Sequence, residues 1–174
     1  AKQRIKTFSC VIKMGPREII LESIAEHKLE FEEPIKNTII VTLPGIKKLH
    51  THCVLIIGQH SLSINAFVIR KPDQNQSQIH EWLLHKNINL YALSYAVNEL
   101  GDVYLVGRLP LDSVTSSELD RIFGAVLEYC DTTFNTLLEM GFADAIRREW
   151  AWRLSRGESM ENLKAFAHLV ETER

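Results

Sequence analysis

The most regular hydrophobic pattern in the chain lies between Leu49 and Ile69, where two apolar runs meet at a short polar turn. Apolar and polar residues alternate along both runs, which is typical of β-strands that bury one face. Gly58-Gln59 separates the runs, and Gly at the first loop position favours a two-residue type II′ turn. The pattern therefore predicts a β-hairpin in which Ile57 faces His60.

This register divides the hairpin into two faces of different polarity. One face is nearly all apolar and pairs Leu55 with Leu62 and Cys53 with Ile64. The other face is mixed, and it carries His50, His52, Val54, Ile56, Ser61, Ser63, Asn65 and Phe67. We expect the first face to lie in the core. We also expect the second face to be covered, since a large exposed apolar patch favours association.

Periodicity assigns the remaining elements. The pattern predicts helices at 15–29, 74–88 and 115–140, strands at 38–43, 92–98 and 103–109, and further helices before and after Gly157. The acidic stretch 30–33 and Pro34 are interpreted as the end of the first helix. Asp73 with Gln76 and Thr115 with Glu118 fit capping boxes, and Gly141 indicates a helix stop.

The resulting order is α-β-β-β-α-β-β-α, with short connections between consecutive strands. Such an order predicts an α+β fold: an antiparallel sheet of about five strands with helices packed on it, plus C-terminal helices. We expect three segments along the chain. Residues 1–14 form an arm to which the pattern assigns no structure, residues 15–156 form the α+β domain, and residues 157–174 form a C-terminal helical tail.

Composition narrows the function classes. The chain has 174 residues, enough for one domain, and 45% hydrophobic residues, enough for a core. Its formal charge of −2 argues against nucleic acid as a partner, and no apolar run is long enough to span a membrane. Cys10, Cys53 and Cys130 form no CxxC pair, and no apolar leader follows the charged beginning. These features predict reduced thiols and a cytoplasmic protein.

Five segments in order resemble a known family. They are VTLPG (41–45), SLSINAFVIRKPD (61–73), GDVYLVGRLPL (101–111), ELDRIFGAVLEY (118–129) and REWAWR (148–153). Together they are similar to actinobacterial YbjN-domain proteins over roughly 38–156. The resemblance implies the fold of type III secretion chaperones, whose element order matches the one above. Proteins of this fold in secretion systems are small dimers that bind extended segments of client proteins. The family implies no catalytic residue.

Two histidines pose the question of a metal site. His50 and His52 are two residues apart on one predicted strand and so share a face, as a metal-binding pair would. No acidic ligand or CxxC accompanies them, and an exposed polar sheet edge explains them more simply. We therefore predict no metal and no cofactor. The chain also lacks the common nucleophile, zinc-protease and nucleotide-binding motifs, so we predict that it is not an enzyme.

The segment REWAWR carries the other candidate site. Helical geometry places Trp150 toward the core and Trp152 toward solvent, beside Arg148 and Arg153. An exposed aromatic among arginines has the composition of a binding hot spot, whereas the alternative is an amphipathic ring that covers the next helix. The arginines of this region (Arg147, Arg148, Arg153 and Arg156) are also candidates for binding an anion. Possible pairs of Arg148 with Asp144 and Arg153 with Glu149 weaken that idea.

These observations lead to a functional prediction. We expect a non-catalytic protein-binding module, chaperone-like or regulatory, that binds a protein client or peptide segment through Val54, Ile56, Phe67, Trp152, Arg148 and Arg153. The alternative is a small-molecule or anion sensor that uses the arginines of the C-terminal helices. We also expect a symmetric homodimer. The alternative is that the C-terminal helices cover the second sheet face within one chain.

Overall fold

The computed structural model describes residues 14–171 and contains one antiparallel sheet of six strands. The strands are β1 (Glu30–Ile35), β2 (Thr38–Pro44), β3 (His50–Ile57), β4 (Ser61–Ile69), β5 (Leu93–Val97) and β6 (Val103–Pro110), in the spatial order β1-β2-β3-β4-β6-β5. The α-helices are α1 (Pro16–Glu26), α2 (Gln76–Asn87), α3 (Ser116–Arg156) and α4 (His168–Glu171). Two 3-10 helices, η1 (Leu111–Ser113) and η2 (Glu161–Phe166), complete the described chain. The arm predicted at 1–14 lies, apart from Met14, outside the described residues.

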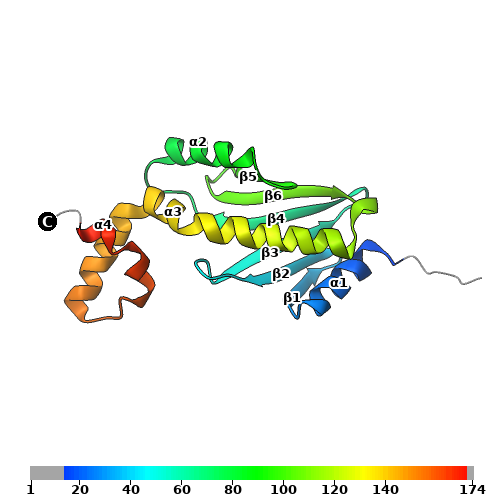
Figure 1. Cartoon of the computed structure of the whole chain (residues 1–174), viewed down its shortest axis with the longest axis horizontal. Helices are drawn as coiled ribbons and strands as arrows, with labels where there is room; N and C mark the ends of the chain where they lie inside the picture. The colour runs from blue at the N-terminus through cyan, green and yellow to red at the C-terminus, as the bar shows by residue number, and fades with distance from the viewer. Residues whose placement is uncertain (1–13, 172–174) are drawn as a thin grey trace, which may run out of the picture.

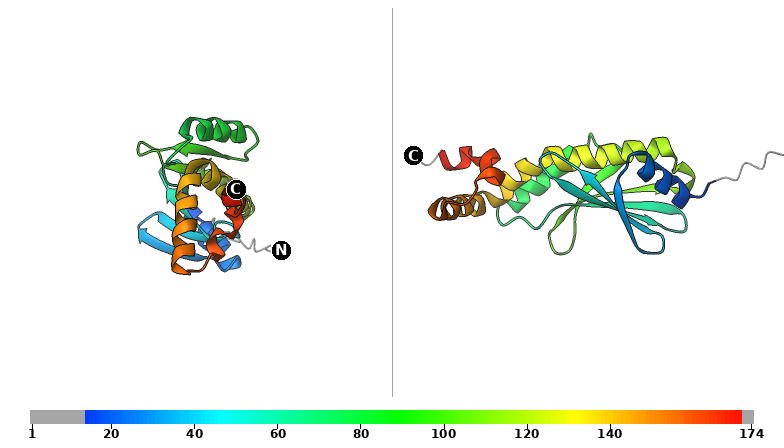
Figure 2. Two further views of the ribbon diagram at one scale, coloured as in Figure 1. Left: turned by 90° about the vertical axis from the view of Figure 1, so that its left-hand side faces the viewer. Right: turned by 90° about the horizontal axis from the view of Figure 1, so that it is seen from below.

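The helices and the sheet form two layers, which confirms the α+β prediction. The long helix α3 crosses one face of the sheet, with α1 beside it near β1 and β2 and with α2 beside β5 (Figure 1). The opposite face carries no helix of the described chain (Figure 2, right). The segments η2 and α4 pack against α3 beyond the end of the sheet. They leave that face open, so the alternative that C-terminal helices cover it is wrong for the described residues.

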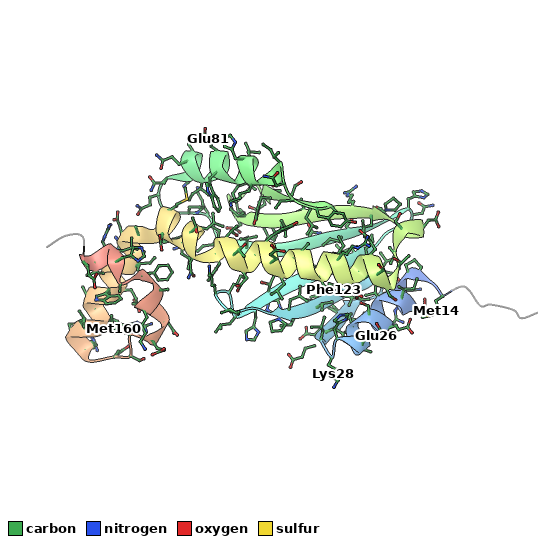
Figure 3. The ribbon with its side chains drawn as sticks, viewed as in Figure 1. Met14, Glu26, Lys28, Glu81, Phe123 and Met160 are labelled. Carbon is green, nitrogen blue, oxygen red and sulfur yellow. The ribbon has the colours of Figure 1, made fainter. Side chains whose placement is uncertain are left out.

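The core lies between α3 and the covered face of the sheet. Every second residue of the central strands points into it: Ile39, Val41, Leu43, Thr51, Cys53, Leu55, Leu62, Ile64, Ala66 and Val68 are all buried. From α3, one stripe meets them at three- and four-residue spacing, including Leu119, Phe123 (labelled in Figure 3) and Leu137. Both Cys53 and Cys130 are buried here as free thiols.

The prediction of about five strands missed β1. The sequence pattern assigns residues 30–33 and Pro34 to the end of the first helix, because an acidic run with proline lacks the alternation of a half-buried strand. The strand exists because its backbone pairs with β2, where Phe31 opposes Val41 and Glu32 opposes Ile40. It is an edge strand, and charged residues and Pro are common at edges because they discourage further pairing.

The predicted hairpin has the right faces but the wrong register. Leu55 opposes Ile64 and Ile57 opposes Leu62, a slip of two residues from the predicted pairs. Three residues, Gly58 to His60, lie between the two strands, and the Gly58 N–H donates to the Ser61 carbonyl at 2.9 Å. Because side chains alternate with a period of two, a two-residue slip keeps every side chain on its predicted face.

The helix ends can be compared with the capping and stop residues that the sequence predicts. Thr115 caps α3 as predicted, its hydroxyl accepting from the Glu118 N–H at 3.2 Å, and Gly157 ends the helix at a φ of 65°. The break expected at Gly141 appears one residue later, as a non-helical Phe142 (φ −140°, ψ 18°) within α3. The predicted capping box at Asp73 is wrong: α2 begins after Asn75, and Asp73 pairs with Arg70 instead.

Candidate protein-binding surface

The open face of the sheet carries an apolar strip bordered by polar side chains. We call it the open-face strip, and it consists of Ile40, Val54, Ile56, Phe67, Tyr104 and Val106. Alternation places these residues opposite the core positions, and pairing brings them together: Val54 lies between Ile40 and Asn65, and Asn65 opposes Val106. Ile56 is 42% exposed and Phe67 40%, so apolar side chains reach solvent where no helix covers them.

Two features give the open-face strip a defined shape. The rings of Phe67 and Tyr104 contact edge to face, with centroids 5.5 Å apart, which stabilises both at one end. Beside the strip, a shallow hollow of about 550 Å³ is lined by Ser63, Asn65, Ser94 and Arg108 among others. Apolar side chains beside serine, asparagine and arginine groups suit an extended peptide, which presents side chains and backbone amides together.

The predicted histidine pair lies on this face as exposed side chains. His52 Nδ1 is 3.2 Å from the Thr42 hydroxyl, and His50 is the first residue of β3. Within residues 14–171, no group of three His, Cys, Asp or Glu side chains is placed to hold a metal ion. β3 lies between β2 and β4, so the two histidines stand on the open face of a central strand and not on a sheet edge as the sequence suggested.

The second candidate cluster lies on the last turns of α3, beyond the end of the sheet (Figure 1). Trp152 is 45% exposed, as predicted, and the Arg156 guanidinium lies 5.3 Å from its ring centroid. Arg148 and Trp152 line a small hollow together with Ala145 and Glu149. The structure thus brings Arg148 and Trp152 together, and it places Val54 and Ile56 elsewhere.

The remaining arginines of this region have structural partners. Arg153 pairs with Glu149 at 2.7 Å and donates to the Ser159 carbonyl at 2.8 Å, so it holds the turn after Gly157. Arg147 donates to the Leu169 carbonyl at 3.0 Å and pairs with Asp144, which was predicted to pair with Arg148. These contacts tie the C-terminal segment to α3, and they weaken the alternative of an arginine-based anion sensor.

Sequence reasoning missed one further feature, a groove where the sheet ends and the C-terminal segment begins. Two hollows that share Lys48, Phe134 and Leu138 form it, and we call it the end groove. Phe67 lines one hollow and Phe166 lines the other. The signal in the sequence was Ile46-Lys47-Lys48-Leu49, a loop with more apolar character than a turn requires. Ala145 and Glu149 line both the end groove and the Trp152 hollow, so the two surfaces adjoin.

Comparison with known proteins identifies the family. A family model described as "Putative bacterial sensory transduction regulator" matches residues 16–139. The chain belongs to the YbjN family. Two mycobacterial relatives extend the match: an uncharacterised protein of Mycobacterium leprae is 50% identical over 135 residues, covering 78% of this chain and 73% of the relative. A Mycobacterium tuberculosis protein is 51% identical over 134 residues, covering 77% and 73%. The actinobacterial resemblance is therefore confirmed.

Solved structures confirm the fold of this YbjN-family chain. YbjN from E. coli superposes with a TM-score of 0.52 at 12% identity, covering 71% of this chain and 91% of that one. A chain of the ExsC–ExsE complex gives 0.51 at 13% identity, with coverage of 69% and 90%. A chain of the ExoU–SpcU complex from the type III secretion system of Pseudomonas aeruginosa gives a TM-score of 0.50 at 13% identity, with coverage of 66% and 93%.

Among the described helices, none is both long and apolar enough to cross a membrane.

Proposed function

We propose that this protein is a non-catalytic, protein-binding module of chaperone-like or regulatory type, acting in the cytoplasm, that holds an extended segment of a client protein. The observation that carries the proposal is the open-face strip, where Val54, Ile56 and Phe67 reach solvent on a sheet face that the described helices leave bare. Contiguous apolar side chains exposed on one face, with polar groups around them, are characteristic of interaction sites.

Two considerations support a protein ligand. Chains with this fold occur in the ExsC–ExsE complex and in the heterodimeric ExoU–SpcU complex, each a complex with a second protein. The strip itself is flanked by hydroxyl, amide and guanidinium groups of Ser63, Asn65 and Arg108, which can pair with the backbone of an extended segment. We propose Trp152, Arg148 and Arg153 as a second contact region. In this proposal residues 15–156 are the functional unit, and residues 157–174 are a tail.

We further propose a symmetric homodimer, formed through the open face or through the solvent side of α3. A two-fold contact through either surface would be self-complementary. Sedimentation equilibrium at micromolar concentration tests it. A dimer gives twice the monomer mass of 20.0 kDa, and a mass near 20.0 kDa at every concentration rejects it.

Site-specific photo-crosslinking tests the client-binding proposal. A photoreactive phenylalanine analogue replaces Ile56 on the strip, and in a matched control it replaces Leu84, an apolar residue of α2 that is 66% exposed and lies away from the strip. Irradiation in native cytoplasm should give a client adduct from position 56 and none from position 84.

The outcomes distinguish client binding at the open face from dimer formation through it. An adduct between two copies of this chain at position 56 assigns the open face to the dimer and rejects it as the client site. Equal adducts from both positions, or none from position 56, contradict binding of either kind at the strip.

A further inference from the structure

The end groove has the size and lining of a small-molecule site. Its two hollows measure about 590 and 560 Å³, within the range of roughly 300–1,000 Å³ that ligand pockets occupy. Apolar side chains from distant parts of the chain line it: Phe67 and Val68 from β4, Phe134, Leu138 and Ile146 from α3, and Leu163 from η2. A groove built this way offers an apolar ligand contact from three sides.

Local structure explains why the groove is there. At Phe142 the helix α3 leaves α-helical geometry, and after Gly157 the chain turns back so that η2 packs on α3 (Figure 1). On the other side, the loop between β2 and β3 is held to α3 by Asp131, whose Oδ1 accepts the N–H groups of Ile46, Lys47 and Lys48 at 2.7–2.9 Å. This carboxylate fixes the backbone of Lys48 at the floor of the groove.

Lys48 is the cation that the two hollows share. Its Nζ donates to the carbonyls of Phe67 and Val68, the latter at 2.9 Å, and lies 5.2 Å and 5.8 Å from the ring centroids of Phe67 and Phe134. Burial lowers the pKa of Lys48, with a smaller opposing effect of Cys130. The positive charge is therefore held in apolar surroundings, where it is costly unless an anion compensates it.

In the hollow that Phe67 lines, the other charged groups already have partners. Arg70 pairs with Asp73 through two hydrogen bonds of 2.8 and 3.0 Å, and its guanidinium lies over the Phe142 ring. Glu149 pairs with Arg153. Among residues 14–171, no Asp or Glu forms an ion pair with Lys48. In the hollow that Phe67 lines, Lys48 is thus the one cation without a counter-charge among the described residues. The second hollow adds only Lys47, which is exposed.

We infer that the end groove binds an amphiphilic monocarboxylate, a hydrocarbon chain whose single carboxylate pairs with Lys48 while the chain lies along the apolar walls. One unpaired ammonium matches one carboxylate. A phosphate head group would need several donors or a bidentate arginine, and the arginine at the groove, Arg70, is engaged by Asp73. This inference goes beyond the proposed function, because it concerns a small ligand in a groove that shares Phe67 with the open-face strip but does not include Val54 or Ile56.

Titration calorimetry with the full chain and dodecanoate, below its micelle concentration, tests the inference. Saturable one-to-one binding is expected. Lys48→Met keeps the length and apolar stem of the side chain, and it should weaken dodecanoate binding at least about tenfold, the effect of losing a charge-assisted contact. Lys36→Met, at an exposed lysine of the turn between β1 and β2 that lines neither hollow, is the matched control and should bind as the wild type does.

A neutral ligand and a blocked groove complete the design. Dodecanol should bind the wild type more weakly than dodecanoate does, and Lys48→Met should remove that difference. Ala145→Phe adds a ring inside the groove while Lys48 remains, so it should abolish binding of both ligands, and melting temperatures verify that each variant is folded. The inference is overturned if dodecanoate does not bind, if Lys48→Met binds it as the wild type does, or if Ile56→Glu on the open face abolishes binding while Ala145→Phe does not.

Discussion

Placing a carboxylate on either face of the β3–β4 hairpin tests the central feature of the fold. Leu55 and Ile64 oppose each other and are fully buried under α3. Ser63 opposes Ile56 on the open face and neighbours Arg108 of β6. The three single variants Leu55→Asp, Ile64→Asp and Ser63→Asp therefore introduce the same group at adjacent positions of one ladder.

The expected costs differ widely. Removing a buried Leu or Ile side chain costs about 1.5–3 kcal/mol of transfer free energy. A buried aspartate stays protonated, because its charged form is too costly to bury. Keeping the proton at pH 7 costs about 4 kcal/mol, since pH 7 lies roughly three units above the ordinary pKa of about 3.9 and each unit is worth 1.36 kcal/mol. The sum of about 6 kcal/mol is comparable with the whole stability of a typical domain, about 5–15 kcal/mol. Ser63→Asp should change stability by no more than about 0.5 kcal/mol, since its charge stays in water near Arg108.

Urea unfolding at pH 7 and at pH 4 measures the free energy of unfolding and so separates the transfer cost from the ionisation cost. Leu55→Asp and Ile64→Asp should be unfolded or nearly so at pH 7. Each should recover most of the ionisation cost, relative to the wild type at the same pH, near pH 4. Ser63→Asp should follow the wild type at both pH values. Equal large losses in all three variants, or buried-site losses that do not shrink at pH 4, would refute the assignment of the faces.

Three further predictions concern the thiols, the loop and metals. Burial raises the pKa of Cys53 to about 12 and that of Cys130 to about 11, above the ordinary 9.0. The unfolded chain then releases these protons first, so the free energy of unfolding should fall as the pH rises above about 9, and less steeply in Cys53→Ala. Gly45→Ala should destabilise the loop that carries Lys48 and lower the melting temperature, because its Cβ would meet the Lys48 carbonyl and lie 2.7 Å from Asp131 Oδ1. Gly124→Ala, inside α3 with no atom within 4 Å of the added carbon, should raise the melting temperature, because alanine favours the helix. A strong chelator should leave the melting temperature unchanged, and a metal-dependent gain in stability would contradict the prediction of no metal site.

Local patterns in the sequence determined which faces of the elements are buried. Alternation along β3 and β4 placed Leu55 and Ile64 in the core and Val54 and Ile56 outside, and the structure agrees. Helical spacing from Leu119 onward predicted the part of α3 before Gly141, and a separate helix was predicted before Gly157. Thr115 and Gly157 mark the two ends of the helix that joins them. These features are readable because each depends on residues within a few positions of one another, where backbone geometry alone relates side chains to faces.

Tertiary structure decided what depends on pairing between distant segments. The strand β1 forms because β2 offers it hydrogen-bonding partners, and its own acidic sequence carries no alternation. The observed hairpin register differs from the predicted one by two residues. A period-two pattern is unchanged by such a slip, so the alternation alone could not distinguish the two registers. The end groove depends entirely on the tertiary fold. It brings together Lys48, Phe134 and Leu163, which are far apart in sequence and which no local periodicity relates.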